Sequence, residues 1–290
     1  MTSPSGLLLI RGLGHSGTTI LDLSLGVHPE IIGLGEAMRL LRQPRPEEIG
    51  RGPAYLRGHG RFKRRCTCEA LAVNCPLWGP MLDWLSSHDN LPLEKKLDRL
   101  LALAERNKSI PGRPSPRWIV ESYQADTVSP DWLVEQLGRP VRVIFLVRDV
   151  RSWIHSRTRR VRNPLSGCQA LIRWWWMNRK VERKLNASCC PVFQMGYEEL
   201  ALEPEKTLER LCNWLNLTFD KSMLRPGGNS SSHILSGNRI RFDIDHCANI
   251  RYDASWLTCQ SPAVSFALAI PAIASMNRRL VYSSKTITRL

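Results

Sequence analysis

An apolar run near the start of the chain leads directly into a glycine-rich loop. Residues 7–19 read LLLIRGLGHSGTT. Gly12, Gly17 and Thr19 fit the phosphate-loop pattern G-x-x-x-x-G-K-[ST], but Thr18 stands where the lysine belongs. Such a loop presents backbone N–H groups and a helix N-terminus to phosphate oxygens, without the side chain that reaches the β- and γ-phosphates of a triphosphate. The segment therefore predicts a phosphate site for a ligand other than Mg-ATP.

Short apolar, β-branched runs alternate with helical patterns along the rest of the chain, which predicts an α/β fold. We expect strands at 7–10, 31–36, 118–121, 141–147 and 192–196. We expect the main helices at 16–27, 37–41, 77–86, 93–107, 150–160, 166–185 and 204–216. Apolar runs of this kind suit strands buried on both faces. The prediction is a three-layer, P-loop-like parallel sheet flanked by helices, as one domain over residues 1–290 with a cysteine-bearing insertion.

A second motif lies where the strand at 141–147 ends. Arg148 follows this strand, and Ser156 lies eight residues on, about two turns into the next predicted helix. The carboxyl ends of parallel strands form the crevice in which open α/β sheets bind ligands. A planar guanidinium and a nearby hydroxyl suit a second phosphate group. Taken alone, Arg148 is equally consistent with a surface residue that caps the strand.

The insertion at 42–80 is rich in Pro, Gly and Arg and is predicted to form a lid. It contains Cys66, Cys68 and Cys75, which are possible zinc ligands with His59 or His88 as a fourth. The spacing C-x-C-x6-C is not a standard zinc pair. It favours a lid with free or locally paired thiols, so no metal is expected.

The phosphate loop without lysine, followed by a strand, Arg148 and Ser156, resembles the sulfotransferases that use 3′-phosphoadenosine 5′-phosphosulfate (PAPS). The similarity is to the bacterial group and, more distantly, to the tyrosylprotein sulfotransferases. It extends over about residues 7–256 and includes further short motifs. These are L-D at 21–22, H-P at 28–29, G-E at 35–36, C-P-L-W at 75–78, Y-E-E-L at 197–200, and His233 with G-N-R at 237–239 and Arg241.

The resemblance implies specific roles for residues of this chain. The first loop would hold the 5′-phosphosulfate, Arg148 and Ser156 the 3′-phosphate, and the stretch 228–256 would close over nucleotide and acceptor. The residues so implied as PAPS-binding are Arg11, Gly14, His15, Ser16, Gly17, Thr18, Thr19, Arg148, Ser156, Gly237, Asn238 and Arg239.

Two catalytic residues and two departures from the family pattern also follow from the resemblance. Glu36 matches the family's catalytic base, although a first-turn acid of the helix at 37–41 explains it equally well from sequence alone. His15 replaces a cation beside the transferred group and is expected to stabilise the leaving oxygen. Gln124 replaces a lysine common in relatives, and Arg11 is expected to supply that contact.

Composition narrows the possible partners. Lys and Arg number 41 against 26 Asp and Glu, a net charge of +15 that favours an anionic ligand. A degenerate P-loop kinase or NTPase and a nucleic-acid-binding protein remain as alternatives, although no nucleic-acid-binding signature appears. The nine cysteines and the lack of a basic leader or membrane span predict a cytoplasmic protein. The expected acceptor is a small molecule with a hydroxyl or amine, such as a natural product.

Overall fold

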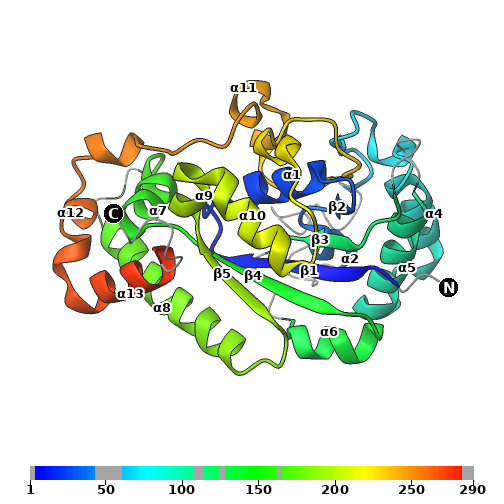
Figure 1. Cartoon of the computed structure of the whole chain (residues 1–290), viewed down its shortest axis with the longest axis horizontal. Coiled ribbons are helices and arrows are strands. Elements are labelled where there is room, and N and C mark those ends of the chain that lie inside the picture. Colours follow the sequence, from blue (N-terminus) through cyan, green and yellow to red (C-terminus); the bar gives the residue numbers. More distant parts are fainter. Residues whose placement is uncertain are drawn as a thin grey trace.

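Five parallel strands form one sheet at the centre of the molecule (Figure 1). The computed structural model describes residues 4–42, 61–107, 114–123, 128–161, 163 and 165–282. The strands are β1 (Gly6–Gly12), β2 (Ile31–Gly33), β3 (Trp118–Glu121), β4 (Val141–Val147) and β5 (Val192–Gly196). Their order in the sheet is β2-β3-β1-β4-β5. The strand that carries the phosphate loop is therefore the central one, and β4, which precedes Arg148, is its direct neighbour.

Helices cover both faces of the sheet and give the predicted three layers. The longer ones are α1 (Thr18–Val27), α4 (Trp78–His88), α5 (Leu93–Arg106), α6 (Pro130–Leu137), α7 (Val150–Thr158), α8 (Ser166–Asn186), α10 (Pro204–Trp214) and α13 (Pro271–Val281). The shorter helices are α2 (Ala37–Leu41), α9 (Tyr197–Leu202), α11 (Ile244–Cys247) and α12 (Pro262–Ser265). Single 3-10 turns are η3 (Ala72–Asn74), η4 (Lys221–Leu224), η5 (Arg239–Phe242), η6 (Ser255–Thr258) and η7 (Ala267–Ala269).

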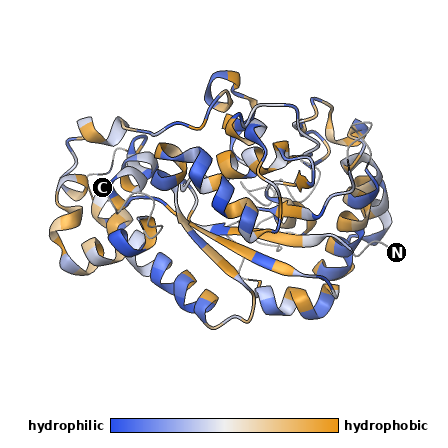
Figure 2. Cartoon of the chain, in the orientation of Figure 1, coloured by the Kyte–Doolittle hydropathy of each residue, from blue (hydrophilic) through white to orange (hydrophobic). Residues whose placement is uncertain are grey.

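Two hydrophobic cores lie on opposite sides of the sheet because side chains alternate along each strand. Leu7 and Leu9 of β1 pack with α2, α4, α5 and α8, whereas Leu8 and Ile10 pack with α1 and α10. All four side chains are fully buried, which stabilises the fold by about 1.5–3 kcal/mol for each of them. Figure 2 shows the strands as mostly hydrophobic and the helices as hydrophobic on one side. The predicted α/β fold is confirmed.

The base of the loop after β1 is fixed by a close backbone approach. A Cβ atom on Gly12 would lie 2.2 Å from the carbonyl oxygen of Leu146 on β4. A larger residue would push β1 and β4 apart at the point where the two strands deliver the loop and Arg148. Glycine is therefore required here for packing between strands.

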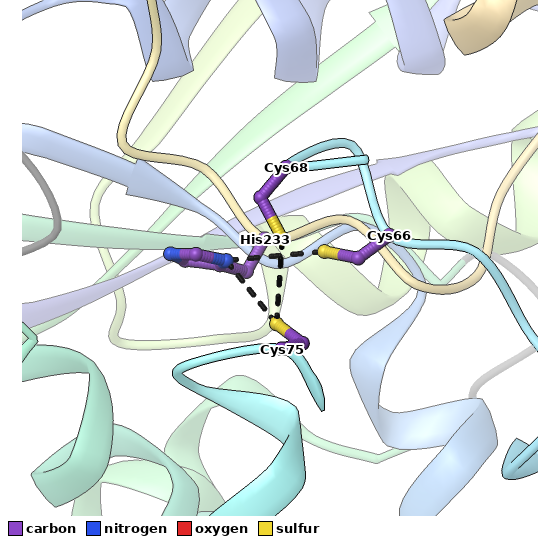
Figure 3. A group of neighbouring side chains, drawn as sticks. All are labelled: Cys66, Cys68, Cys75 and His233. Carbon is purple, nitrogen blue, oxygen red and sulfur yellow. Dashed lines mark hydrogen bonds between the residues drawn. The ribbon is translucent and has the colours of Figure 1, made fainter. Parts of the chain in front are cut away.

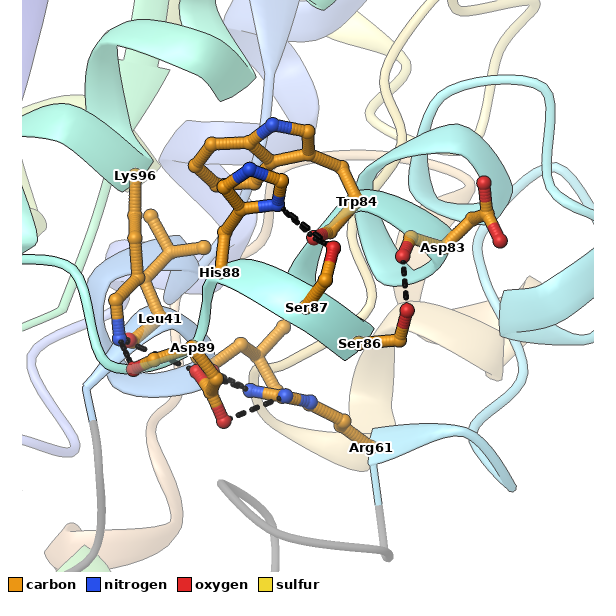
Figure 4. A network of polar contacts seen from close by, with 10 residues as sticks. Leu41, Arg61, Asp83, Trp84, Ser86, Ser87, His88, Asp89 and Lys96 are labelled. Carbon is orange, nitrogen blue, oxygen red and sulfur yellow. Dashed lines mark hydrogen bonds and ion pairs between the residues drawn. The ribbon is translucent and has the colours of Figure 1, made fainter.

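A polar network holds the C-terminal end of α2 (Figure 4). Lys96 is 2% exposed and donates to the carbonyl of Leu41 and to Asp89. Arg61 donates to the carbonyl of Leu40 and forms a 2.8 Å ion pair with the same aspartate. Two cations thus satisfy carbonyls that the short helix leaves unpaired, and one carboxylate balances both charges.

Candidate active site

The phosphate loop turns sharply into α1 through two residues in the left-handed region. Gly17 has φ 88° and precedes the helix, and His15 has φ 75°, a conformation that non-glycine residues rarely adopt. A Cβ atom on Gly17 would lie 2.2 Å from the ring of Tyr197. The loop is therefore held against this ring, in a strained form of the kind that accumulates at binding sites.

Arg148 lies beside this loop at the end of β4 and uses three different nitrogens. Nε donates to the Ser152 hydroxyl at 2.7 Å, Nη1 to the His15 carbonyl at 3.0 Å and Nη2 to Asp253 at 2.7 Å. Its guanidinium also stacks 4.9 Å from the centre of the Tyr197 ring. These contacts fix the guanidinium in place, and only 6% of the residue is exposed.

Two tryptophans tie the loop and the arginine to the helices behind them. Trp153 of α7 donates from Nε1 to the Gly14 carbonyl at 2.8 Å. Trp174 of α8 donates from Nε1 to the Arg148 carbonyl at 2.9 Å. Ser156 of α7 lies with its hydroxyl 3.4 Å from Nδ1 of His15. The two sequence motifs therefore meet in space, through α7.

A cavity of about 660 Å³ opens between these elements and the segment 238–255. This volume lies in the usual range of small-molecule and cofactor sites. Of the predicted residues, its walls include His15, Gly17, Thr18, Thr19, Arg148, Ser156 and Asn238. The predicted residues that do not line it are Arg11, Gly14, Ser16, Glu36, Gly237 and Arg239.

The walls of the cavity are rich in positive charge. Burial and the neighbouring cations Arg157 and Arg148 lower the pKa of His15, so the imidazole is biased towards its neutral form. Burial acts to raise the pKa of Asp253, but hydrogen bonds from Ser255 and Arg148 outweigh it and hold that pKa at about 2. The walls therefore carry Asp253 and a second carboxylate, Asp245, among a larger number of arginines, and this excess of positive charge attracts anions.

Glu36 lies at a separate position, immediately before α2. Its carboxylate forms a 2.5 Å ion pair with Arg39 and accepts from the Ser236 hydroxyl at 3.4 Å. Its backbone N–H donates to the Ser236 carbonyl at 2.9 Å, next to an isolated bridge between residues 35 and 236. The segment 233–237 thus passes alongside β2 and holds Glu36 in place.

Arg11 points to the α2 side of the sheet. It forms a 3.0 Å ion pair with Glu121, whose other oxygen accepts from the Met38 N–H. Arg11 Nη2 is buried and makes no hydrogen bond. Gln124, which stands where the resembling family commonly has a lysine, lies outside the described residues.

The cysteines of the insertion gather around a histidine that sequence analysis had placed elsewhere. Cys66, Cys68 and Cys75 surround His233 of the late segment (Figure 3). His88, one of the two histidines considered with them, instead stacks on Trp84 with ring centres 4.5 Å apart (Figure 4). His88 therefore does not join the cysteines, because α4 carries it elsewhere. The other histidine, His59, lies outside the described residues.

No protein-family model matches the chain. A Caenorhabditis briggsae protein named "Putative protein-tyrosine sulfotransferase" is 23% identical over 271 residues, 88% of this chain and 82% of that protein. The chain is related to the sulfotransferases.

Two solved structures agree with this relationship at the level of the fold. The sulfotransferase domain of the olefin synthase of Synechococcus PCC 7002 is 18% identical with a TM-score of 0.53, covering 93% of this chain and 95% of its own. The sulfotransferase domain of the curacin biosynthetic pathway has the same identity and TM-score, covering 92% and 98%. The resemblance found in the sequence and the sulfotransferase class of enzyme are confirmed.

Several residues of this sulfotransferase-like site were not predicted as ligands. Tyr197 was noted only as part of a motif, yet its ring supports both Gly17 and Arg148. Asp253 and Arg251 line the cavity from a stretch without a recognisable pattern.

The described residues contain no helix whose length and hydrophobicity would allow it to cross a lipid bilayer.

Proposed function

We propose that the protein transfers a sulfuryl group from PAPS to a hydroxyl or amine of a small-molecule acceptor. The observation that carries this proposal is the meeting of a lysine-free phosphate loop with Arg148 and Ser156 around one cationic cavity. A nucleotide with phosphates at both its 5′ and 3′ positions needs two such sites at a fixed separation. The degenerate kinase and the nucleic-acid-binding protein lack a supporting observation of this kind.

In this proposal the donor lies along the cavity. The N–H groups at 16–19 and the start of α1 bind the 5′-phosphosulfate, because helix N-termini attract anions. Arg148 and Ser156 bind the 3′-phosphate. The phosphate takes the place of the Asp253 carboxylate on Nη2 of Arg148, so the arginine stays paired in both states. Asn238, in the segment 228–256, contributes a wall that closes over the nucleotide.

The reaction is an in-line displacement in which the protein supplies position and charge. The acceptor oxygen or nitrogen forms a bond to sulfur, and the bond from sulfur to the bridging 5′-phosphate oxygen breaks. Glu36 takes the acceptor's proton, and 3′-phosphoadenosine 5′-phosphate (PAP) leaves with the electron pair. His15 and the loop N–H groups stabilise the charge on the departing oxygen.

The surroundings of Glu36 indicate the charge of the acceptor. Arg39 is paired with it, and Arg64 and Arg241 interact with it electrostatically. Arg239 in turn lies close enough to Arg64 and Arg241 to interact with both. Burial and the nearby Arg64 lower the pKa of Arg241 to about 10. A region so crowded with cations favours an acceptor that carries negative charge of its own. Arg64 belongs to the insertion 42–80, which therefore contributes to this cationic region around Glu36.

A thermal-shift titration tests the donor. At a hundred times its Kd, PAP should stabilise the protein by about 2.7 kcal/mol, which corresponds to a shift in Tm of about 4 °C. ADP, which lacks the 3′-phosphate, should give a much smaller shift at the same concentration, and Mg-ATP should give no larger one. Equal shifts for PAP and ADP would contradict the roles of Arg148 and Ser156. A preference for Mg-ATP would instead favour the kinase.

A further inference from the structure

Four side chains that can bind a metal converge from two distant parts of the chain. Cys66, Cys68 and Cys75 come from the insertion, and His233 comes from the segment that runs alongside β2 (Figure 3). Their ligand atoms all lie within 4.8 Å of one another. Cys66, Cys75 and His233 are buried, and Cys68 is half-buried. None of the four lines the cavity proposed for the nucleotide.

Three of the six separations among the ligand atoms are close to the edges of one coordination tetrahedron, and the others are within 4.8 Å. Tetrahedral zinc, with Zn–S and Zn–N bonds of about 2.3 and 2.05 Å, places sulfurs about 3.8 Å apart and sulfur and nitrogen about 3.6 Å apart. Sγ of Cys68 and Sγ of Cys75 are 3.7 Å apart. Nδ1 of His233 lies 3.3 Å from Sγ of Cys75 and 3.8 Å from Sγ of Cys66. A disulfide would need sulfurs about 2.05 Å apart.

The backbone around the cluster aims these atoms at one point. The Cys66 N–H donates to the Ala70 carbonyl, and Glu69 adopts φ 69° in the turn between them. The Trp78 N–H donates to Sγ of Cys75 at 3.4 Å, the type of contact that stabilises a thiolate ligand. The loop is therefore shaped around the sulfurs, with α4 beginning immediately behind them.

His233 is fixed in position by hydrogen bonds of its backbone and of its ring. Its backbone N–H donates to the Gly33 carbonyl at 2.9 Å, and its carbonyl accepts from Nε1 of Trp78 at 2.6 Å. Nε2 lies 2.7 Å from the side-chain amide of Asn107, while Nδ1 faces the sulfurs. Because the oxygen and nitrogen of an amide are interchangeable by a flip, Asn107 can accept an Nε2–H, which makes Nδ1 the unprotonated nitrogen that a metal ligand requires.

We propose that Cys66, Cys68, Cys75 and His233 bind one zinc ion in a closed structural site. Three thiolates and one imidazole in a tetrahedron suit zinc better than hard, oxygen-seeking cations. With all four positions taken by protein, no position remains for a substrate or water. The site is therefore expected to act in folding and in catalysis only through the segments it joins.

The joined segments include the partner of Glu36. His233 is three residues from Ser236, whose hydroxyl and carbonyl contact Glu36. Arg64, two residues before Cys66, donates to the Leu235 carbonyl at 3.0 Å. The ion would fasten the insertion to this segment, and it would thereby fix the surroundings of Glu36.

The first test measures metal in the wild-type protein, purified with a phosphine reductant and without added chelator. Elemental analysis should find about one zinc per chain, and cobalt exchanged into the site should give the intense visible bands of a tetrahedral cobalt thiolate. Less than about a tenth of an equivalent, even after incubation with Zn²⁺, would overturn the proposal. So would mass spectrometry that shows a Cys68–Cys75 disulfide under the same reducing conditions.

Variants locate the metal. Cys75→Ser and His233→Ala should each lose at least about tenfold in zinc affinity, whereas Cys168→Ser, at an exposed cysteine of α8, should keep wild-type zinc content. Full zinc content in both site variants would overturn the assignment. If these variants do not fold, cobalt spectra of the wild-type protein still decide between thiolate and non-thiolate ligands. PAP binding by the wild-type protein provides a separate readout, since its failure there bears on the donor proposal alone.

Discussion

Each side-chain nitrogen of Arg148 already makes a hydrogen bond before any ligand arrives. Arg148 donates to a serine, a backbone carbonyl and Asp253, and it stacks on Tyr197. Such a side chain is already ordered, so binding a phosphate costs little further side-chain entropy. If Arg148 binds the 3′-phosphate as proposed, the Asp253 carboxylate gives up its contact with Nη2 and repels the incoming anion. The two residues are therefore expected to have opposite effects on nucleotide affinity.

Replacing Asp253 should strengthen PAP binding. Asp253→Asn removes one negative charge from the cavity and frees Nη2 of Arg148, so we expect about a tenfold lower Kd for PAP by calorimetry. Arg148→Ala should abolish the preference for PAP over ADP. Asp83→Asn, at an exposed position of α4, serves as the charge control and should bind as the wild type does. Weaker binding by Asp253→Asn would mean that this carboxylate contacts the ligand favourably.

Glu36 is expected to act in turnover and not in donor binding. Glu36→Gln keeps the shape and the contact with the Ser236 hydroxyl but removes the base, so the turnover number should fall by about a hundredfold or more. PAP affinity should remain within about twofold, because Glu36 does not line the nucleotide cavity. Glu135→Gln, on the exposed side of α6, is the matched control. Wild-type turnover in Glu36→Gln would remove Glu36 from the mechanism.

The predicted candidates that the structure brings together are those in regular local patterns of the sequence. The loop after β1 and the strand before Arg148 have clear apolar and glycine signals, and the structure brings Arg148, Ser156 and His15 together. The sequence predicted neither the role of Asp253 nor the approach of His233 to the cysteines. Both depend on where the irregular segment 228–256 lies relative to the sheet. Such long-range placement produces no periodic pattern in the sequence from which it could be predicted.

At the scale of elements, strands were easier to predict than helix ends. The predicted strands at 118–121, 141–147 and 192–196 match β3, β4 and β5. β3 and β4 are almost fully buried, as short apolar runs in a parallel sheet are, whereas the edge strand β5 is only half-buried over residues 192–194. The expected strand at 31–36 ends at Gly33, since the chain then turns towards α2. α6 was missed although Pro130 at its start and Gly138 after its end are standard helix boundaries.

The carboxylate at the end of α4 should be important for stability. Asp89 balances Lys96 and Arg61, both nearly fully buried. Asp89→Asn leaves these two charges without a counter-charge, so we expect the free energy of unfolding in urea to fall by about 2–3 kcal/mol. The matched control is Asp98→Asn, which breaks a 3.5 Å ion pair of a more exposed carboxylate and should cost less than about 1 kcal/mol. Equal losses would mean that the buried network has no special role.

At the scale of the whole molecule, one buried carboxyl should shape the dependence of stability on pH. Burial, with a contribution from Asp149, raises the pKa of Glu198 from its ordinary value of 4.5 to about 8. The unfolded chain releases this proton at lower pH than the folded chain does. Stability from this group is therefore complete below pH 4.5 and is lost progressively as the pH rises towards about 8.

Glu198→Gln should remove that loss. The amide oxygen can still accept from the Asp149 N–H, which Glu198 does at 2.9 Å, without a charge to bury. Relative to the wild type, the variant should gain on the order of 3 kcal/mol in free energy of unfolding between pH 5 and pH 8. Glu209→Gln, on the exposed side of α10, should show no such trend. Urea unfolding at both pH values measures it, and parallel curves for Glu198→Gln and the wild type would contradict the assignment.

The position of β1 in the sheet has a consequence for how the chain reaches this structure. β1 is made first, yet both its neighbours come much later: Leu7 aligns with Ile119 of β3 and with Val141 of β4. During synthesis, the apolar first strand has no partner until more than a hundred further residues have emerged. Such non-local pairing slows folding and exposes hydrophobic surface meanwhile. The nascent chain should therefore depend on chaperones until β4 has left the ribosome.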